Sequence, residues 1–278
     1  MVRITADFQQ ERVLHPAAIP LLSEFFTKGW ADPNKLNNSS RQTAILLQQV
    51  RQTFANALNV RPDEIEFLGE VDLGFQLGIA GLLKPESKLY YSKIDRQKVY
   101  AVAANEQNLG RSTTCLSVNG DGEIADFTCD TNDVICWQVA NGESGNLQKV
   151  LKNQALTFAD CTASGVDHLP QFDYQTALFD SSSWQGPAGF GVLVIRSAEK
   201  WRNPLPHNDL SRTPGTFSIP LALASSVALE NYLKEGDIRS KLKQEIIAFI
   251  KSEITDVDIA STADGLAKFI SFSIKGIE

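Results

Sequence analysis

Several residue types that often carry chemistry are scarce in this chain. Its 278 residues include three histidines, one methionine and four cysteines. The cysteines have no CxxC spacing and no histidine pair lies near them, which argues against a zinc site or a redox-active pair. We therefore expect mostly buried, reduced thiols of a cytoplasmic protein at these four positions: Cys115, Cys129, Cys136 and Cys161.

Long apolar runs and an excess of positive charge are also missing. No stretch approaches the roughly 20 apolar residues that a membrane-spanning helix needs, and the first residues lack the apolar core of a signal peptide. The formal net charge is −7 and the pI is near 5.1, which disfavours non-specific binding to nucleic acid or to anionic membranes. We expect neither as a partner.

Motifs of several common enzyme classes are absent as well. There is no G-x-S-x-G turn, and no histidine follows a strand in the order that a Ser-His-Asp hydrolase requires. The three histidines are His15, His168 and His207. A dinucleotide fold is disfavoured because no G-x-G-x-x-G opens a helix after a strand. A metal site built from the carboxylates Asp72, Asp160 and Asp180 is an alternative that this pattern leaves open.

What the chain does contain is an alternation of helical and β-rich segments. Residues 39–60 predict a helix that begins at a serine cap and places Leu47, Val50, Phe54 and Leu58 on one face. Residues 72–83 and 96–108 also have a helical pattern. Short apolar runs predict strands within residues 63–69, 87–93, 112–118, 133–140, 155–160, 174–180 and 190–196.

This alternation predicts the fold class. Short apolar strands separated by helices are typical of an α/β protein with a mostly parallel sheet covered on both faces. After that, residues 218–254 predict two helices broken near Gly236, and residues 268–276 predict one strand. We expect a large α/β domain over residues 17–215. Residues 1–16 and 216–278 would form a reduced α+β small domain with its connecting helix.

Acidic residues follow the predicted strands. Ligands of open α/β sheets bind beyond the carboxyl ends of the strands, although an acidic residue there is often only a helix cap. The residues at those ends are Asp72, Asp95, Gly142, Glu143, Asp160 and Asp180. Five carboxylates at one edge of a sheet would make an acidic cleft.

Taken in order, segments across nearly the whole chain resemble the class V aminotransferase family, and most closely its cysteine desulfurases. Residues 139–148 resemble the family's Asn-Asn-Glu-Thr-Gly segment, and residues 158–165 resemble its Asp-Ala-Val-Gln-Ala-Gly strand end. Further segments with such likeness are residues 6–16, 32–42, 64–82, 177–196 and 212–216. The resemblance implies the three-layer fold of the large domain of pyridoxal phosphate (PLP) transferases, a PLP cofactor and a homodimer.

One loop departs from the family where its chemistry would lie. Residues 181–189 resemble the loop that carries the Schiff-base lysine, and they keep Gly186, Pro187 and Gly189. The resemblance places the lysine at Ser183 and the histidine before it at Ser182. A serine hydroxyl cannot form a Schiff base, so no catalytic residue of this loop is retained.

The other cofactor positions have changed too. The resemblance places the ring-stacking histidine at Arg96, an asparagine at Gly142 and a glutamine at Ala163, and it keeps Asp160 as partner of the pyridinium nitrogen. The phosphate-binding positions fall at Glu70, Asp72 and Asp180, and the turn that reaches the phosphate across the dimer ends at Thr216. Each carboxylate within about 4 Å of a phosphate would cost roughly 1 to 4 kcal/mol, more than the 0.3 to about 1 kcal/mol that a helix end contributes.

These changes predict a catalytically degenerate, C-terminally shortened relative of the cysteine desulfurases, without PLP or metal, that serves as a scaffold or regulator. The chain ends before the segment that would carry the sulfur-accepting cysteine, so no cysteine here inherits that role. Two alternatives stay open. The remodelled cleft could serve a different chemistry, with Arg96, Asp72, Asp160 and Asp180 around a small cationic ligand. A partner subunit could also restore desulfurase activity.

Overall fold

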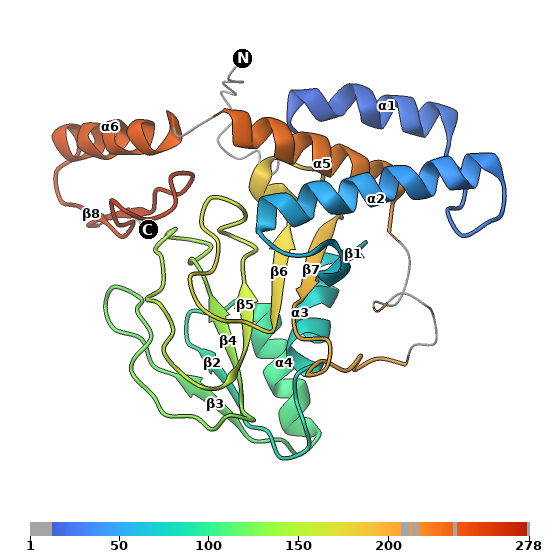
Figure 1. Ribbon diagram of the computed structural model, residues 1–278. Helices are drawn as coiled ribbons and strands as arrows, with labels where there is room; N and C mark the ends of the chain where they lie inside the picture. Colours follow the sequence, from blue (N-terminus) through green and yellow to red (C-terminus); the bar gives the residue numbers. More distant parts are fainter. Residues whose placement is uncertain (1–12, 207–211, 213–216, 236–237, 277–278) are drawn as a thin grey trace.

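A computed structural model describes residues 13–206, 212, 217–235 and 238–276 (Figure 1). Its helices are α1 (Ile19–Lys28), α2 (Asn38–Leu58), α3 (Val71–Ala80), α4 (Gln97–Asn108), α5 (Ile219–Lys234) and α6 (Ile238–Glu253). Short 3-10 turns are η1 (Pro16–Ala18), η2 (Pro62–Glu64) and η3 (Ser181–Trp184). The break predicted near Gly236 lies outside the described residues.

The centre of the molecule is a seven-stranded sheet with the order β1-β7-β6-β5-β4-β2-β3. Its strands are β1 (Ile65–Leu68), β2 (Leu89–Ser92), β3 (Thr113–Leu116), β4 (Val134–Gln138), β5 (Leu156–Asp160), β6 (Thr176–Asp180) and β7 (Gly191–Ile195). Strand β7 runs antiparallel to both neighbours, and the pairs from β6 to β3 are all parallel. The predicted α/β class with a mostly parallel sheet is therefore confirmed.

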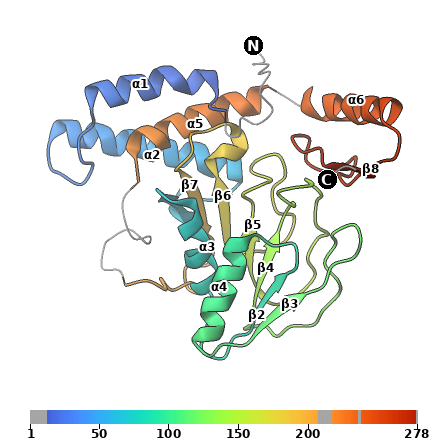
Figure 2. The same cartoon turned by 180° about the vertical axis from the view of Figure 1, so that it is seen from behind.

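Helices cover both faces of the sheet near β6 and β7. Because side chains alternate along a strand, Val192 and Val194 of β7 pack with α2 and α5, whereas Leu193 and Ile195 pack with α3 and α4. Figure 2 shows α3 and α4 lying on their face of the sheet. Helix α3 approaches the sheet closely because it carries a glycine at position 78, where an added Cβ would lie 2.5 Å from the Phe158 ring.

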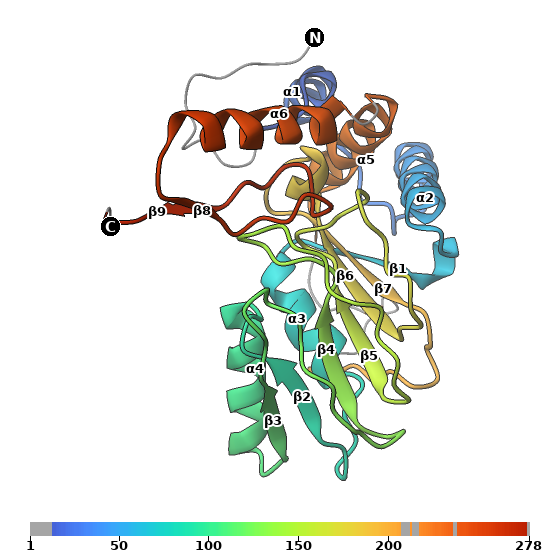
Figure 3. The ribbon, with the colours of Figure 1, turned by 90° about the vertical axis from the view of Figure 1, so that its left-hand side faces the viewer.

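The face of β2, β3 and β4 that points away from α3 and α4 is covered differently. Tyr90, Ile135 and Trp137 point to this side and form a separate core with residues of the surrounding loops. Figure 3 shows loops, rather than a helix, over this part of the sheet. The apolar core here is consequently closed by irregular chain.

The C-terminal segment adds a small unit to this body. It consists of α6 and a two-stranded antiparallel sheet of β8 (Val257–Ile259) and β9 (Phe272–Ile274). The Leu266 N–H donates to the Gly145 carbonyl at 2.8 Å, and the Ser261 hydroxyl donates to the Ser144 carbonyl at 2.6 Å. Helix α5 packs into the core with α1 and α2, and the domain boundary at residue 215 stays a prediction.

Most predicted elements are present, with a few corrections. The predicted face of α2 is buried at Val50, Phe54 and Leu58, but the helix is capped by the side chain of Asn37 and not by a serine. Helix α1 and strand β8 were not anticipated. The cysteines are all free, and only Cys136 and Cys161 are buried, since Cys115 is exposed and Cys129 is half-buried.

None of the helices in the described part of the chain is both long and apolar enough to cross a membrane.

Candidate functional site

Two adjoining cavities lie at the carboxyl ends of the parallel strands, and both are lined by Arg96, Gln97 and Glu143. We call them together the acidic cleft. The larger has a volume of about 490 Å³ and includes Glu70, Asp72, Lys98, Thr162 and Asp180. The smaller, of about 360 Å³, includes Lys93, Asp95, Gln138, Gly142 and Asp160. The five acidic residues that follow the strands therefore lie together at one edge of the sheet.

Asp160, the last residue of β5, is 4% exposed and lines the smaller cavity of this cleft. Its Oδ1 accepts hydrogen bonds from the backbone N–H and the hydroxyl of Thr162, at 2.9 and 2.6 Å. Its Oδ2 lies 3.5 Å from Nε of Arg96, the residue that precedes α4. Both carboxylate oxygens thus have partners within the chain.

Gly142 makes room for this arginine. A Cβ added at position 142 would lie 2.8 Å from Nη2 of Arg96, so the guanidinium packs directly against the glycine. In this position Arg96 lines both cavities and contacts the Asp160 carboxylate. The side chain of Arg96 can lie here only because residue 142 is a glycine.

A second buried carboxylate lies beside Asp160. Asp95 accepts hydrogen bonds from the Ser92 N–H at 2.6 Å and from Nε2 of Gln138 at 2.9 Å. Burial raises the pKa of Asp95 to about 6 in spite of these donors, and the charge of Asp160 adds to the rise. An acid with this pKa changes its charge close to neutral pH.

The N-terminus of α3 is surrounded by carboxylates of the chain itself. Glu70 caps the helix, with its Oε1 accepting from the Asp72 N–H at 3.2 Å. Asp72 in turn forms an ion pair with Lys98 at 2.7 Å, and its hydrogen bond raises the pKa of that amine. Asp180 accepts from the Ser182 N–H at 2.9 Å and thereby caps η3. A helix N-terminus favours anions, and here the carboxylates of the chain itself take that place.

Two hydroxyls of the serine-rich loop, those of Ser181 and Ser183, have partners within the chain. Ser183 is buried, and its hydroxyl donates to the Asp180 carbonyl at 2.7 Å. The Ser181 hydroxyl lies 2.6 Å from that of Ser225, which also accepts from the Trp184 indole at 3.1 Å. These contacts make the loop a packed structural turn.

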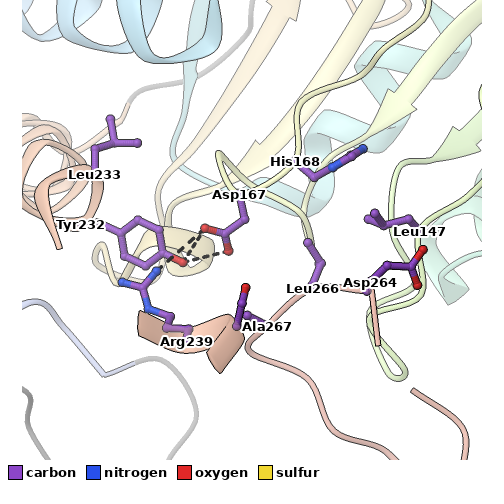
Figure 4. A pocket seen from close by; sticks show the side chains of 11 residues that line it. Leu147, Asp167, His168, Tyr232, Leu233, Arg239, Asp264, Leu266 and Ala267 are labelled. Carbon is purple, nitrogen blue, oxygen red and sulfur yellow. Dashed lines mark hydrogen bonds and ion pairs between the residues drawn. The ribbon is translucent and has the colours of Figure 1, made fainter. Parts of the chain in front are cut away.

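A lysine that the sequence did not single out reaches this loop from the C-terminal unit. Nζ of Lys268 donates to the Ser183 carbonyl at 3.0 Å and lies 3.2 Å from Asp167. Burial lowers the pKa of Lys268. Figure 4 shows that the same Asp167 carboxylate accepts from the Tyr232 hydroxyl, at 2.8 Å to both oxygens. These contacts tie the loop to α5 and to the C-terminal segment.

The remaining predicted positions are distributed as follows. Ala163 is buried in a small apolar cluster with Ala140 and Leu266, and offers no side-chain hydrogen bond. Thr216 lies outside the described residues. The alternative of a metal bound by Asp72, Asp160 and Asp180 finds no support, since no group of three or more His, Cys, Asp or Glu in the described ranges is placed to hold an ion.

The curated proteins to which this chain is similar are cysteine desulfurases. No family model matches the chain. The cysteine desulfurase IscS of Clostridium botulinum (strain Hall) is 23% identical over 304 residues, covering 99% of this chain and 77% of the relative. IscS of Dictyoglomus turgidum is 22% identical, covering 98% of this chain and 76% of the relative.

Solved structures agree with these matches. A NifS-like protein superposes with a TM-score of 0.85 at 18% identity, covering 95% of this chain and 80% of that one. The NifS-like protein of Rickettsia africae gives a TM-score of 0.80 at 17% identity, covering 96% and 80%. The fold is that of the NifS-like, PLP-dependent class V aminotransferases. By sequence, the chain is a distant homologue of the IscS cysteine desulfurases.

Proposed function

We propose that this protein is a desulfurase-like chain that does not bind PLP and acts through binding, as a scaffold or regulator. The contact between Arg96 and Asp160 carries the proposal. The family resemblance implies that Asp160 would face the pyridinium nitrogen of the cofactor. Here its Oδ2 faces the guanidinium of Arg96 at 3.5 Å, so the chain provides its own cation where the cofactor's would bind.

The covalent anchor is the second argument. The lysine position is Ser183, whose hydroxyl is bound to the Asp180 carbonyl. Two lysines line the acidic cleft, Lys93 and Lys98. The ion pair with Asp72 raises the pKa of Lys98, so that amine stays protonated and is a poor nucleophile. Lys268 is engaged by Asp167 and the loop carbonyl.

The third argument concerns the place where the phosphate group of PLP would bind. Glu70, Asp72 and Asp180 line the larger cavity beside the N-terminus of α3, where a phosphate dianion would need hydrogen-bond donors and positive charge. The residues present therefore do not fit PLP at the ring, at the covalent anchor or at the phosphate. The predicted homodimer and the alternative of a cationic ligand in the acidic cleft stay predictions.

The proposal is tested by adding PLP to the purified protein, reducing with borohydride and locating labelled lysines by mass spectrometry. We expect no Schiff-base absorbance and no labelled lysine in the wild-type chain, and no release of sulfide from cysteine. The Ser183→Lys variant should not gain saturable binding of PLP, because Arg96 still contacts the Asp160 carboxylate. Ser183→Lys combined with Arg96→His should bind PLP more tightly than either single variant.

A cysteine desulfurase treated in the same way is the positive control. Stoichiometric labelling of one lysine in the wild-type chain would overturn the proposal.

A further inference from the structure

Helix α1 lies on the outside of the molecule, on the far side of α5 from the central sheet (Figure 1). It packs against α5, and its residues Leu21, Leu22 and Phe25 are partly buried against the core of that region. No residue of α1 is fully buried, although the helix is rich in apolar side chains. A helix that is apolar beyond the face that its own chain covers has apolar surface left for another contact.

The uncovered side chains share one face of α1. At 3.6 residues per turn, Ile19, Ser23 and Phe26 lie on one side of the helix, and all three are exposed, Ile19 by 47% and Phe26 by 60%. Trp30, just beyond the end of the helix, is 45% exposed, and its ring meets that of Phe26 edge to face with 6.3 Å between the ring centroids. We call these four residues the outer face of α1.

Exposed large apolar side chains gather in this part of the chain. Five of the twelve in the described residues lie within residues 19–45, since Leu36 of the following loop and Ile45 of α2 add to the three on the outer face of α1. Single exposed apolar residues are ordinary, whereas a group of them marks an interaction site. Aromatic residues are also enriched where proteins associate. The outer face of α1 therefore has the composition of an interaction surface.

The charge of this face indicates which partner fits it. Glu24 and Lys28 are the only charged residues of α1, and they form an ion pair with each other at 2.7 Å. The helical repeat places both on the side opposite Phe26. The whole chain has a net charge of −7, which makes two copies repel each other. An uncharged apolar face is a place where two such copies can nevertheless meet.

Symmetry adds to this argument. A contact between two copies across a two-fold axis brings the same patch of each copy together, so the patch must be complementary to itself. An uncharged apolar patch meets this requirement, because Phe26 of one copy can pack against the apolar side chains of the other. A charged patch would face its own charge.

We propose that the outer face of α1 binds the same face of a second copy of this chain, with the two helices antiparallel and the two-fold axis near Ser23 and Phe26. This contact goes beyond the proposed function and does not depend on it, because no residue of the outer face lines the acidic cleft. The homodimer implied by the family resemblance involves the turn that ends at Thr216. Should that dimer form as well, α1 would join two dimers.

Sedimentation velocity of the full chain at increasing concentration measures the association. We expect the mass to rise with concentration. Phe26→Glu and Trp30→Glu each place a charge opposite its own copy, and each should raise the dissociation constant about tenfold or more, as for the loss of an interface hot spot. Phe26→Leu keeps the side chain apolar and should retain the association. Phe249→Glu is the matched control, since Phe249 is 65% exposed on α6.

A disulfide test locates the contact. Ser23→Cys, in a chain whose exposed Cys115 is changed to serine, should form a covalent dimer when a thiol oxidant is added, because the two-fold axis brings position 23 of both copies together. Ser252→Cys, at an exposed position of α6, is the control and should form none.

Unfolding in urea checks that the variants fold, as expected for changes at exposed positions. An association that both α1 variants weaken and Phe249→Glu does not, together with the covalent dimer of Ser23→Cys, supports the proposal. A chain that stays monomeric at every concentration refutes it. An association that Phe26→Glu and Trp30→Glu leave unchanged refutes it as well.

Discussion

At the scale of single residues, the acidic cleft is defined by how its charges are paired. One oxygen of Asp160 accepts from Thr162 and the other faces Arg96, whereas Asp95 accepts hydrogen bonds from the neutral donors Ser92 and Gln138. A buried carboxylate with only neutral donors retains much of its desolvation cost. This difference makes Asp95 the position where pH should affect stability.

Asp95→Asn tests this. Burial raises the pKa of Asp95 from its ordinary 3.8 to about 6 in the folded chain. The folded state therefore binds this proton more tightly, so the group stabilises the fold below pH 3.8 and this stability is lost as the pH rises through about 6. The loss corresponds to roughly 3 kcal/mol. Unfolding in urea from pH 4 to 7 should show a smaller decline in Asp95→Asn than in wild type.

Asp258→Asn, on the exposed β8 position, is the control and should keep the wild-type decline. A decline of equal size in Asp95→Asn would show that another group causes it.

Many residues of the acidic cleft could be predicted, because the ends of the strands can be recognised in the sequence. The carboxylates at 72, 95, 143, 160 and 180 follow apolar runs, and parallel strands bring such ends to one edge. The contact of Arg96 with Asp160 was not predictable, since it depends on how a long side chain lies over Gly142. Lys268 was missed because its contact with Ser183 joins residues 85 positions apart.

At the scale of elements, α3 illustrates how side-chain size sets the distance between helix and sheet. Its buried glycines at 74 and 78 face Leu178 of β6 and Phe158 of β5. The helix thereby places its N-terminus, with Glu70 and Asp72, at the edge of the acidic cleft. Close packing of α3 is thus part of the geometry of the site.

Gly78→Ala should destabilise the fold although alanine is the better helix former. The added Cβ would lie 2.5 Å from the Phe158 ring, and overpacking of a core costs about 1 to 3 kcal/mol. The gain in helix propensity is at most about 1 kcal/mol. Unfolding in urea measures the difference, with Gly120→Ala, in open space, as the neutral control. Equal stability of Gly78→Ala and wild type would contradict this packing argument.

Element prediction succeeded where the apolar pattern was strong. Each strand of the large sheet coincides with a predicted apolar run. Strands β1, β4, β5 and β7 are buried at every residue, and four or five consecutive buried residues leave a clear apolar run in the sequence. Helix α1 was missed although Leu21, Leu22 and Phe25 give it an apolar face that packs against the core. Strand β8 has three residues, half-buried or exposed, and its pairing with β9 is visible only in three dimensions.

At the scale of the whole molecule, the C-terminal unit contacts the loop at residues 144–146, in addition to the contacts that Lys268 makes with Ser183 and Asp167. Gly145 is the centre of this junction: its φ is +75°, and an added Cβ would lie 2.7 Å from Cβ of Phe269 and 3.3 Å from the Leu266 carbonyl oxygen. The Gly145 carbonyl also accepts from the Leu266 N–H. A side chain here would strain the backbone and separate the two parts.

Gly145→Ala should therefore speed amide hydrogen exchange in residues 257–274 relative to the central sheet. Gly110→Ala is the matched control, since its φ is +85° but nothing lies within 4 Å of an added Cβ. Both variants should lose about 1 to 2 kcal/mol from the left-handed backbone, and only Gly145→Ala should expose the C-terminal amides. Unchanged exchange there would show that the junction does not depend on this contact.

The position of Arg96 has a consequence for any molecule that enters the cleft. A side chain attached to the same chain competes at an effective concentration on the order of millimolar, however dilute the protein is. A free cation that binds Asp160 must therefore be present above this effective concentration of Arg96, or gain affinity from additional contacts. We therefore expect that amines which bind Asp160 weakly do not displace Arg96, even when they are abundant.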